Sequence, residues 1–397
     1  MAEAKNDVRR FRTATQWGVY ELTVRDGAIV EVAGIDADPS PAPIGDVLLD
    51  GVQHNTRIQR PAIRKSWLER KDRGRERRGA EAFINVPWDE ALELAANELH
   101  RVKESYGNKA IFAGSYGWAS AGRFHHAQSQ LHRFINLIGG CTRAMNSYST
   151  AAAQVILPHV VAPWSHMELH QTSWQDVIEH SDLVVAFGGL PLRNTQVAYG
   201  GITEHNSARD MRQASERGVT FCNISPLQQD MPGWLNAQTL MPRPGTDVAL
   251  MLGLAYVLEQ ESLLDRGFLH SHCEGYARFR DYLLGHSDGV AKTPEWAAQL
   301  ADVDAAALVQ LARRMAAERT FITAAWSLQR ADHGEQPYWM VVTLAAMLGQ
   351  IGMPGGGFGF GYAAEGFIGS NHRRFNWATL SKGRNPAAFA IPVARIA

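Results

Sequence analysis

The chain has few cysteines for its length, and this scarcity excludes several classes of protein. Its 397 residues include only Cys141, Cys222 and Cys273, and no two of these form a C-x-x-C pair. A disulfide-stabilised scaffold, a zinc ribbon and a cysteine-bound iron–sulfur cluster are therefore not expected. Hydrophobic residues make up 45% of the chain and charged residues 20%, which is the composition of globular domains with a sizeable core.

Charge of one sign and long apolar runs are missing as well. The formal net charge is −1, so no overall field attracts nucleic acid, a membrane surface or another charged partner. No apolar run is long enough to span a membrane. Arg9 and Arg10 lack the apolar stretch that would follow them in a twin-arginine export leader. A cytoplasmic location is therefore predicted, with a periplasmic one as the alternative if a leader was removed.

Common nucleotide-binding and hydrolase motifs are also absent. Neither G-x-x-x-x-G-K-[ST] nor G-x-S-x-G occurs, which excludes a P-loop and the nucleophile turn of α/β-hydrolases. The glycine-rich run at 355–361 does not fit G-x-G-x-x-G and follows a predicted helix, which disfavours a simple NAD or ATP site. His166 and His170 lack the adjacent glutamate of H-E-x-x-H, so zinc is not expected there.

What the sequence does contain is an alternation of predicted strands and helices. Residues 18–35 alternate apolar and polar around Asp26-Gly27, which is typical of a β-hairpin. Further strands are predicted at 109–114, 182–189, 219–225 and 320–325. Helices are predicted at 87–106, 123–138, 203–217, 248–260 and 337–350. The pattern indicates an α/β fold, with a small N-terminal β region followed by doubly wound lobes with largely parallel sheets.

We expect four regions along the chain. They are a β-rich region at 1–58, the first part of an α/β lobe at 59–167, a Rossmann-like dinucleotide-binding domain at 168–365 and a truncated return segment at 366–397. Ligands of doubly wound sheets bind at the carboxyl ends of the strands. The residues that directly follow the strands are therefore candidates for a site: 115–118, 188–194, 224–226 and 326–330.

Four stretches of the sequence carry a resemblance to a known family. They are GSYGW (114–118), YSTAAAQVILPHV (148–160), PRPGTDVALMLG (242–253) and WSLQRADHGEQPYWMVVTLAAMLGQIGMPGGGFG (326–359). In this order and spacing they resemble the molybdopterin oxidoreductase superfamily, in its branch of dimethyl sulfoxide, trimethylamine N-oxide and biotin sulfoxide reductases. The resemblance runs from about residue 15 to the C-terminus. Family members continue into a C-terminal β-barrel domain, which is expected to be absent here.

The resemblance implies a molybdenum ion carried by two molybdopterin guanine dinucleotides, Mo-bis(MGD), with one serine as its protein ligand. Ser149 occupies the matching position. An anionic alkoxide suits a high-valent, oxophilic metal, and the metal supplies the charge that stabilises the deprotonated form. Where the family often has Gly-Asp, this chain has Asn146 and Ser147, so Ser147 and Cys141 remain alternative ligands. A capping role for Ser149 in the following helix is a further alternative.

Tyr116 and Trp118 match the aromatic pair that lies over the metal in this branch. Each offers one hydrogen-bond donor on an otherwise apolar body, so each could contact the oxygen of a docked substrate while excluding water. The alternative is that both side chains pack in the core.

The resemblance also implies a set of cofactor contacts, which follow strand ends or begin helices: Trp118, Ser149, Arg193, Asn194, Ile224, Ser225, Gly245, Thr246, Asp247, Trp326, Ser327, Arg330 and Gly356. Asp247 would accept hydrogen bonds from the guanine edge, and Arg330 would pair with a phosphate in a bidentate manner. The glycines around Gly356 would let the main chain approach the cofactor closely.

The implied reaction is the reduction of S-oxides or N-oxides by oxygen-atom transfer to Mo(IV). Biotin sulfoxide, methionine sulfoxide, dimethyl sulfoxide and trimethylamine N-oxide are the substrates to consider. Because no iron–sulfur motif is present, electrons are expected from an external donor. The alternative function is a truncated, inactive or partner-binding half of such an enzyme, with the missing C-terminal half as its partner.

Overall fold

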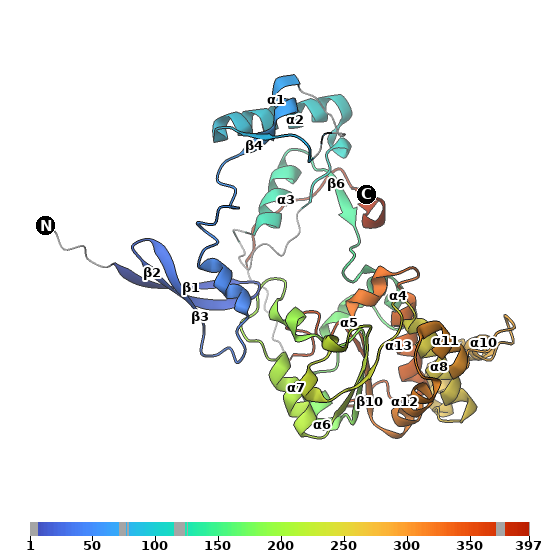
Figure 1. Cartoon of the computed structure of the whole chain (residues 1–397). Helices are drawn as coiled ribbons and strands as arrows, with labels where there is room; N and C mark the ends of the chain where they lie inside the picture. Colours follow the sequence, from blue (N-terminus) through green and yellow to red (C-terminus); the bar gives the residue numbers. More distant parts are fainter. Residues whose placement is uncertain are drawn as a thin grey trace.

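Three strands near the N-terminus form an antiparallel sheet that projects from the rest of the chain (Figure 1). They belong to a computed structural model that describes residues 7–70, 77, 79–114, 124, 126–370 and 378–396. The strands are β1 (Val8–Thr15), β2 (Gly18–Arg25) and β3 (Ala28–Gly34). The predicted hairpin is β2 and β3, with Asp26 and Gly27 at positive φ in the turn. β1 was not predicted, because its exposed, arginine-rich sequence shows no apolar alternation.

A buried hydrogen bond between side chains joins this N-terminal region to the larger lobe. Nδ1 of His205 lies 2.6 Å from Oδ2 of Asp38, and both side chains are almost fully buried. The N–H of His205 donates to the other carboxylate oxygen at 2.9 Å. Nearby, the N–H of Ala198 donates to the carbonyl of Gln16 at 2.9 Å. Both carboxylate oxygens of Asp38 therefore have a hydrogen-bond partner in His205, as burial of a carboxylate requires.

A smaller lobe contains helices and two short sheets. Its elements are β4 (Ala62–Arg64), α1 (Lys65–Arg70), β5 (Phe83–Asn85), α2 (Trp88–Tyr106), α3 (Ala127–Leu137), β6 (Thr142–Met145) and β12 (Phe389–Pro392). The helix predicted at 87–106 is confirmed as α2, with Pro87 as its N-cap residue. The strand predicted at 109–114 is wrong: residues 108–110 form a 3-10 helix, and Phe112 makes a single bridge to Thr142. Short apolar runs do not distinguish a strand from other buried structure.

The return segment meets the smaller lobe at β6. β12 pairs with β6 in parallel, with Phe389 opposite Thr142. The side chain of Asn385 accepts from the N–H of Cys141 at 2.9 Å and donates to its carbonyl at 2.8 Å. This double contact places the segment after residue 377 against the middle of the smaller lobe.

The larger lobe is built on a five-stranded parallel sheet with the order β11-β10-β7-β8-β9. The strands are β7 (Leu183–Phe187), β8 (Thr220–Ile224), β9 (Gln238–Leu240), β10 (Thr320–Ala324) and β11 (Gly357–Phe360). The three central strands β7, β8 and β10 confirm the predicted strands at 182–189, 219–225 and 320–325. The two edge strands were not predicted, because β9 is short and β11 is rich in glycine.

Helices cover both faces of this sheet, and alternate side chains of each strand face opposite layers (Figure 1). Val184 and Ala186 of β7 pack against α6 and α7, whereas Leu183, Val185 and Phe187 pack against α8, α12 and α13. The helices are α4 (Ala151–Val160), α5 (Trp164–Leu169), α6 (Trp174–His180), α7 (Ser207–Glu216), α8 (Asp247–Gln260), α9 (Arg266–His272), α10 (Tyr276–Leu283), α11 (Pro294–Ala301), α12 (Ala305–Ala317) and α13 (Gln336–Met347). The predicted doubly wound α/β fold is therefore confirmed.

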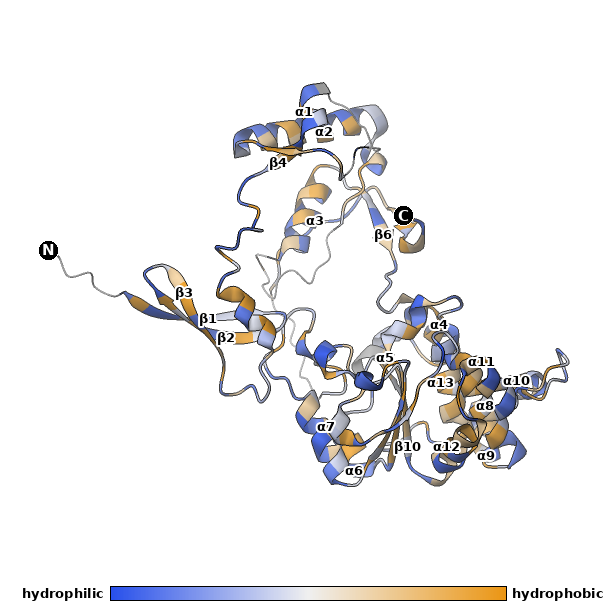
Figure 2. Ribbon diagram, in the orientation of Figure 1, coloured by the Kyte–Doolittle hydropathy of each residue, from blue (hydrophilic) through white to orange (hydrophobic). Residues whose placement is uncertain are grey.

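Two of these helices, α8 and α13, are apolar on nearly all sides and lie inside the helical layer (Figure 2). Each is packed against β-strands or other helices over most of its surface, as expected of α8 from the apolar sequence of 248–260. α4 also enters this core through Ala153 and Leu157, which are fully buried. The boundary at residue 167 between the two α/β regions stays a prediction. None of the described helices combines the length and the hydropathy that a membrane crossing needs.

Candidate functional site

The carboxyl ends of the central strands bring the following loops to one edge of the sheet. β7, β8 and β10 run parallel and in register, so they end side by side at Phe187, Ile224 and Ala324. Main-chain hydrogen bonds continue past these ends: the N–H of Gly188 donates to the carbonyl of Ile224, and the N–H of Ala325 to the carbonyl of Phe187, both at 2.8 Å. The loops that follow these strands therefore begin side by side at the carboxyl edge of the sheet, which is where ligands of such sheets bind.

Two short 3-10 helices follow these strand ends, η5 (Leu192–Gln196) and η8 (Trp326–Arg330). Four of the predicted contact residues are exposed on them: Arg193, Asn194, Ser327 and Arg330. Gly188, with φ 86°, lets the two loops come together, because a Cβ there would lie 2.6 Å from the Cβ of Ala325. The structure thus places these four side chains on adjacent loops at the predicted edge.

A carboxylate outside the predicted set joins two of the predicted residues. Asp230 ends the 3-10 helix Gln228–Asp230. One of its carboxylate oxygens accepts from Nη2 of Arg193 at 2.5 Å, and the other accepts from the hydroxyl of Ser225 at 2.7 Å. Its carbonyl accepts from the N–H of Leu190 at 2.6 Å. Asp230 therefore ties the loops after β7 and β8 together, although nothing in the local sequence marks it.

Ile224 and Ser225 have side chains inside the protein. Their exposed fractions are 0% and 1%. The Ser225 hydroxyl donates to Asp230, and the N–H of Ser225 donates to the carbonyl of Leu240 at 3.1 Å. A ligand at this edge would reach these two residues only through their remaining main-chain groups, and their contact with a cofactor stays a prediction.

Trp326 serves as an anchor of η8. Its indole is 8% exposed and packs against Trp164, Tyr338 and Phe360, with ring centroids 5.7, 5.6 and 6.1 Å away. Gly361 makes room for it, because a Cβ at Gly361 would lie 1.9 Å from the indole nitrogen. The indole therefore holds the exposed residues of η8 in place, and little of it is left to contact a ligand.

The predicted residues Gly245, Thr246 and Asp247 lie at the start of α8. Gly245 has φ 81°, which a turn into the helix requires. The hydroxyl of Thr246 donates to the carbonyl of Arg243 at 2.6 Å and does not cap the helix. Burial raises the pKa of Asp247 to about 6. Hydrogen-bond donors of a ligand would favour its ionised form, as the amino end of the helix also does.

Asp247 lies within electrostatic reach of the loop that contains η8. Burial raises the pKa of the Tyr338 phenol, the main chain at Gln329 and the guanidinium of Arg330 lower it, and the carboxylate of Asp247 raises it. Asp247 and Arg330 thus act on the same phenol from two elements. A carboxylate and a guanidinium are the groups expected for a ligand with a guanine base and phosphates.

Ser149 lies half-buried in the turn between β6 and α4. The side-chain amide of Gln329 connects this turn to η8. Nε2 of Gln329 donates to the carbonyl of Tyr148 at 2.7 Å, and Oε1 accepts from the N–H of Ala152 at 2.8 Å. Nη1 of Arg330 donates to the same Tyr148 carbonyl at 3.5 Å. The turn that contains Ser149, the predicted metal ligand, is therefore hydrogen-bonded to η8, which contains Arg330, the predicted phosphate contact.

The two alternative ligands have other roles in the structure. The hydroxyl oxygen of Ser147 accepts from the N–H groups of Ser149 and Thr150, at 3.3 and 3.4 Å. Cys141 is fully buried in the apolar core of the smaller lobe, against Ile111 and Ile135. Which of the three side chains binds the metal stays a prediction. Tyr116 and Trp118 lie outside the described residues.

Gly356 is not brought to the carboxyl edge of the sheet. It directly precedes β11, and β11 pairs with β10 in parallel, with Gly357 opposite Phe321. A Cβ on Gly356 would lie 3.0 Å from Cδ of Arg319, which precedes β10. Gly356 therefore lies at the amino end of the strands, away from Ser327 and Arg330. The sequence alone did not reveal this, because the position follows from the parallel register of an unpredicted strand.

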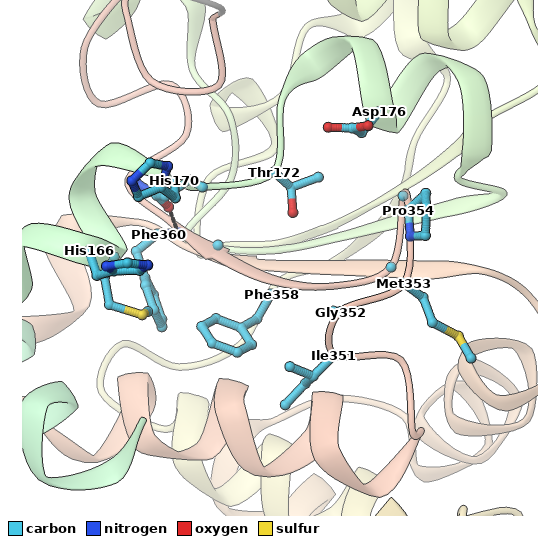
Figure 3. Close-up of a pocket in the computed structure, with 16 residues that line it drawn as sticks. His166, His170, Thr172, Asp176, Ile351, Gly352, Met353, Pro354, Phe358 and Phe360 are labelled. Atoms are coloured by element: carbon cyan, nitrogen blue, oxygen red, sulfur yellow. Dashed lines mark hydrogen bonds between the residues drawn. The ribbon is translucent and has the colours of Figure 1, made fainter. Parts of the chain in front are cut away.

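A pocket of about 410 Å³ extends along β11 (Figure 3). His166, His170 and Thr172 line one side, and residues 351–360 line the other. Among the described residues of the predicted site, only Gly356 contributes to this lining. The rings of His166 and His170 are 4.9 Å apart, and the described part of the chain contains no group of three metal-ligating side chains. The pocket therefore follows β11 from its amino end to Phe360, whose ring packs against Trp326, and the other described residues of the predicted site do not line it.

Comparison with known proteins identifies the family. The molybdopterin oxidoreductase model matches residues 57–389, and the molybdopterin oxidoreductase N-terminal domain model matches residues 13–52. The chain therefore belongs to the molybdopterin oxidoreductase family, as the four sequence stretches predicted.

Several relatives have names that are more specific. A dimethyl sulfoxide/trimethylamine N-oxide reductase of Cereibacter sphaeroides is 43% identical over 87% of this chain and 42% of its own length. A biotin sulfoxide reductase of the same organism is 41% identical over 90% of this chain and 48% of its own. A trimethylamine-N-oxide reductase of Haemophilus influenzae is 39% identical over 90% of this chain and 44% of its own length. The chain thus spans less than half the length of these relatives.

A solved structure supports the fold. Acetylene hydratase from Pelobacter acetylenicus superimposes with a TM-score of 0.58 over 85% of this chain and 43% of that one. At 20% sequence identity, this likeness concerns the arrangement of the strands and helices alone.

Proposed function

We propose that this chain forms the metal-binding part of a molybdenum-dependent reductase of S-oxides or N-oxides. The names of the similar reductases support this function. The observation that carries it is the contact between two segments: the turn with Ser149 is hydrogen-bonded to η8, which bears Ser327 and Arg330. A metal ligand and cofactor contacts must lie together in this way to serve one cofactor.

The side chains at the strand ends fit a molybdopterin guanine dinucleotide. The exposed guanidinium groups of Arg193 and Arg330 match phosphate oxygens. The carboxylate of Asp247 matches the two neighbouring donors on the edge of guanine. Asn194 and Ser327 offer further hydrogen bonds, and the oxygen of Ser149 would be the single protein ligand of the metal.

When bound, the cofactor supplies two-electron oxygen-atom transfer, and the protein supplies the ligand, the orientation and a dry pocket. Two guanine dinucleotides per metal, Mo-bis(MGD), are part of the proposal. Tyr116 and Trp118 would donate hydrogen bonds to the oxygen of the docked substrate. Electrons would come from an external donor, and a cytoplasmic location is proposed. The substrate would be biotin sulfoxide, methionine sulfoxide, dimethyl sulfoxide or trimethylamine N-oxide.

Metal analysis and substitution together test this function. In the full-length gene product we expect stoichiometric molybdenum, bound guanine and reduction of methionine sulfoxide or trimethylamine N-oxide. Ser149→Ala should abolish turnover, whereas Ser147→Ala and Cys141→Ala should retain it. Folded protein without molybdenum would support the alternative, a half that binds a partner polypeptide. Turnover that survives Ser149→Ala and is lost in Ser147→Ala or Cys141→Ala would move the ligand to that residue.

A further inference from the structure

The amide of Gln329 brackets the turn that contains Ser149. Its two hydrogen bonds, at 2.7 Å to the carbonyl of Tyr148 and at 2.8 Å from the N–H of Ala152, fall on either side of Ser149. The partners are 181 and 177 residues away along the chain. These two bonds, here called the Gln329 clamp, therefore join two segments that meet only through the tertiary fold.

The clamp supplies what the turn lacks locally. Ala152 lies in the first turn of α4, where main-chain N–H groups have no acceptor within the helix. Thr150 is the N-cap residue, but its side chain makes no capping bond; its hydroxyl instead accepts from Gln154 at 2.8 Å. The bonds to Ser147 are long, at 3.3 and 3.4 Å. Among the described bonds, Gln329 thus provides the short bond to a main-chain N–H in the first turn of α4.

Gln329 itself is held by the core and does not depend on the turn. Trp326 anchors the same 3-10 helix among buried aromatic rings. On the other side, Gly334 lies against the main chain of Gln329, since a Cβ on Gly334 would be 2.1 Å from the carbonyl oxygen of Gln329. The main chain of Gln329 is therefore held by groups outside the Ser149 turn, and its side-chain amide reaches from this support to the turn.

From this geometry we infer that Gln329 is a positioning residue for Ser149. The inference rests on the proposed function, because it takes Ser149 as the metal ligand. Gln329 lies between Ser327 and Arg330 on one short helix, so a single rigid element orients both the ligand turn and the cofactor contacts. The role requires an amide: it must donate at one end and accept at the other, which neither a carboxylate nor an apolar side chain does.

Gln350 offers a matched control within the same chain. Its Oε1 accepts from the N–H of Thr320 at 2.7 Å, and its Nε2 donates to the carbonyl of Glu318 at 2.9 Å. Like Gln329, Gln350 accepts from one main-chain N–H and donates to one main-chain carbonyl. Its bonds, however, lie at the amino end of β10, the end opposite to η8. Gln350→Leu therefore removes the same two kinds of bond without touching the Ser149 turn.

The first test is hydrogen exchange on the 397-residue chain, without cofactor. In Gln329→Leu the amides of residues 148–154 should exchange roughly five- to tenfold faster than in the parent, as the loss of a helix cap predicts. Gln350→Leu should leave these amides unchanged and accelerate those of residues 318–321. If Gln329→Leu does not fold, Gln329→Glu retains the acceptor and loses the donor, and a smaller acceleration is expected. Unchanged exchange in both Gln329 variants, or equal acceleration in Gln350→Leu, overturns the inference.

The second test is X-ray absorption at the molybdenum edge in the full-length protein. Gln329→Leu should keep the molybdenum content of the parent, yet weaken or disorder the single-oxygen ligand shell, in the direction of the spectrum of Ser149→Ala. Gln350→Leu should have the spectrum of the parent. A parent without molybdenum would overturn the proposed function, while the exchange experiment still decides the clamp. An unaltered spectrum in Gln329→Leu beside an altered one in Ser149→Ala overturns the positioning role.

Discussion

The carboxylate of Asp230 accepts from the buried hydroxyl of Ser225 at 2.7 Å, while its other oxygen holds the exposed guanidinium of Arg193 at 2.5 Å. The Asp230 side chain is 14% exposed and that of Arg193 is 59% exposed. The Asp230 carboxylate is thus fixed by the end of β8 and in turn holds the guanidinium of Arg193 at the surface. This contact holds Arg193 at the carboxyl edge of the sheet.

Removing the Asp230 carboxylate should lower the free energy of unfolding. Asp230→Ala leaves the buried Ser225 hydroxyl without its acceptor, which costs about 1–3 kcal/mol. Urea denaturation measures the loss. Glu261→Gln is the control, because Glu261 makes a bidentate pair with Arg313 at the surface and no buried group depends on it. Equal losses in both variants would contradict the linking role of Asp230.

Asp247 should make stability depend on pH. Its folded-state pKa of about 6 lies above the ordinary value of 3.8, so ionisation opposes folding. The penalty is absent below pH 4, grows as the pH rises through the window from 4 to 6, and then stays constant. Asp247→Asn removes it and should be more stable than the parent by about 2–3 kcal/mol at pH 7, with no advantage below pH 4.

Unfolding experiments at several pH values check the Asp247 prediction. Asp89→Asn is the control, because Asp89 is an exposed carboxylate in the first turn of α2. It should show no pH-dependent gain of this kind. A stability difference between Asp247→Asn and the parent that is the same at pH 4 and pH 7 would speak against burial of the Asp247 carboxyl.

Gly361→Ala should strongly destabilise the larger lobe. The added Cβ would lie 1.9 Å from the indole nitrogen of Trp326, at a residue with φ 72°. Gly275→Ala is the matched control: its φ is 85°, but no atom lies within 4 Å of the added Cβ. The control should lose about 1–2 kcal/mol from the left-handed backbone alone, and Gly361→Ala several kcal/mol more. Denaturation followed by tryptophan fluorescence measures both, and similar losses would refute the packing role of Gly361.

Ser147→Ala should loosen the turn before α4. It removes the acceptor for the N–H groups of Ser149 and Thr150 and should cost about 0.5–1 kcal/mol. Ser147→Thr keeps the hydroxyl and serves as the matched control, with a smaller loss expected in urea denaturation. Stability that is unchanged in Ser147→Ala would show that these two long bonds contribute nothing.

The central strands, the helices α2, α8 and α13 and the turn at Asp26-Gly27 were determined by the sequence itself. Each depends on apolar periodicity or turn residues that act over a few positions, and this local signal survives in the fold. The order of strands followed by exposed residues also predicted the edge at which Arg193, Ser327 and Arg330 lie. The choice of Ser149 as the ligand came from the family resemblance and stays a prediction.

Only the tertiary structure decided which groups hold the site. The side chains of Asp230 and Gln329 each make two hydrogen bonds to other segments of the fold, and such bonds leave no periodic trace in the sequence. The same cause placed Gly356 at the amino end of β11, because the parallel register with β10 sets its position. Local sequence thus determines the elements, whereas contacts between distant segments determine the orientation of Ser149 and Arg193.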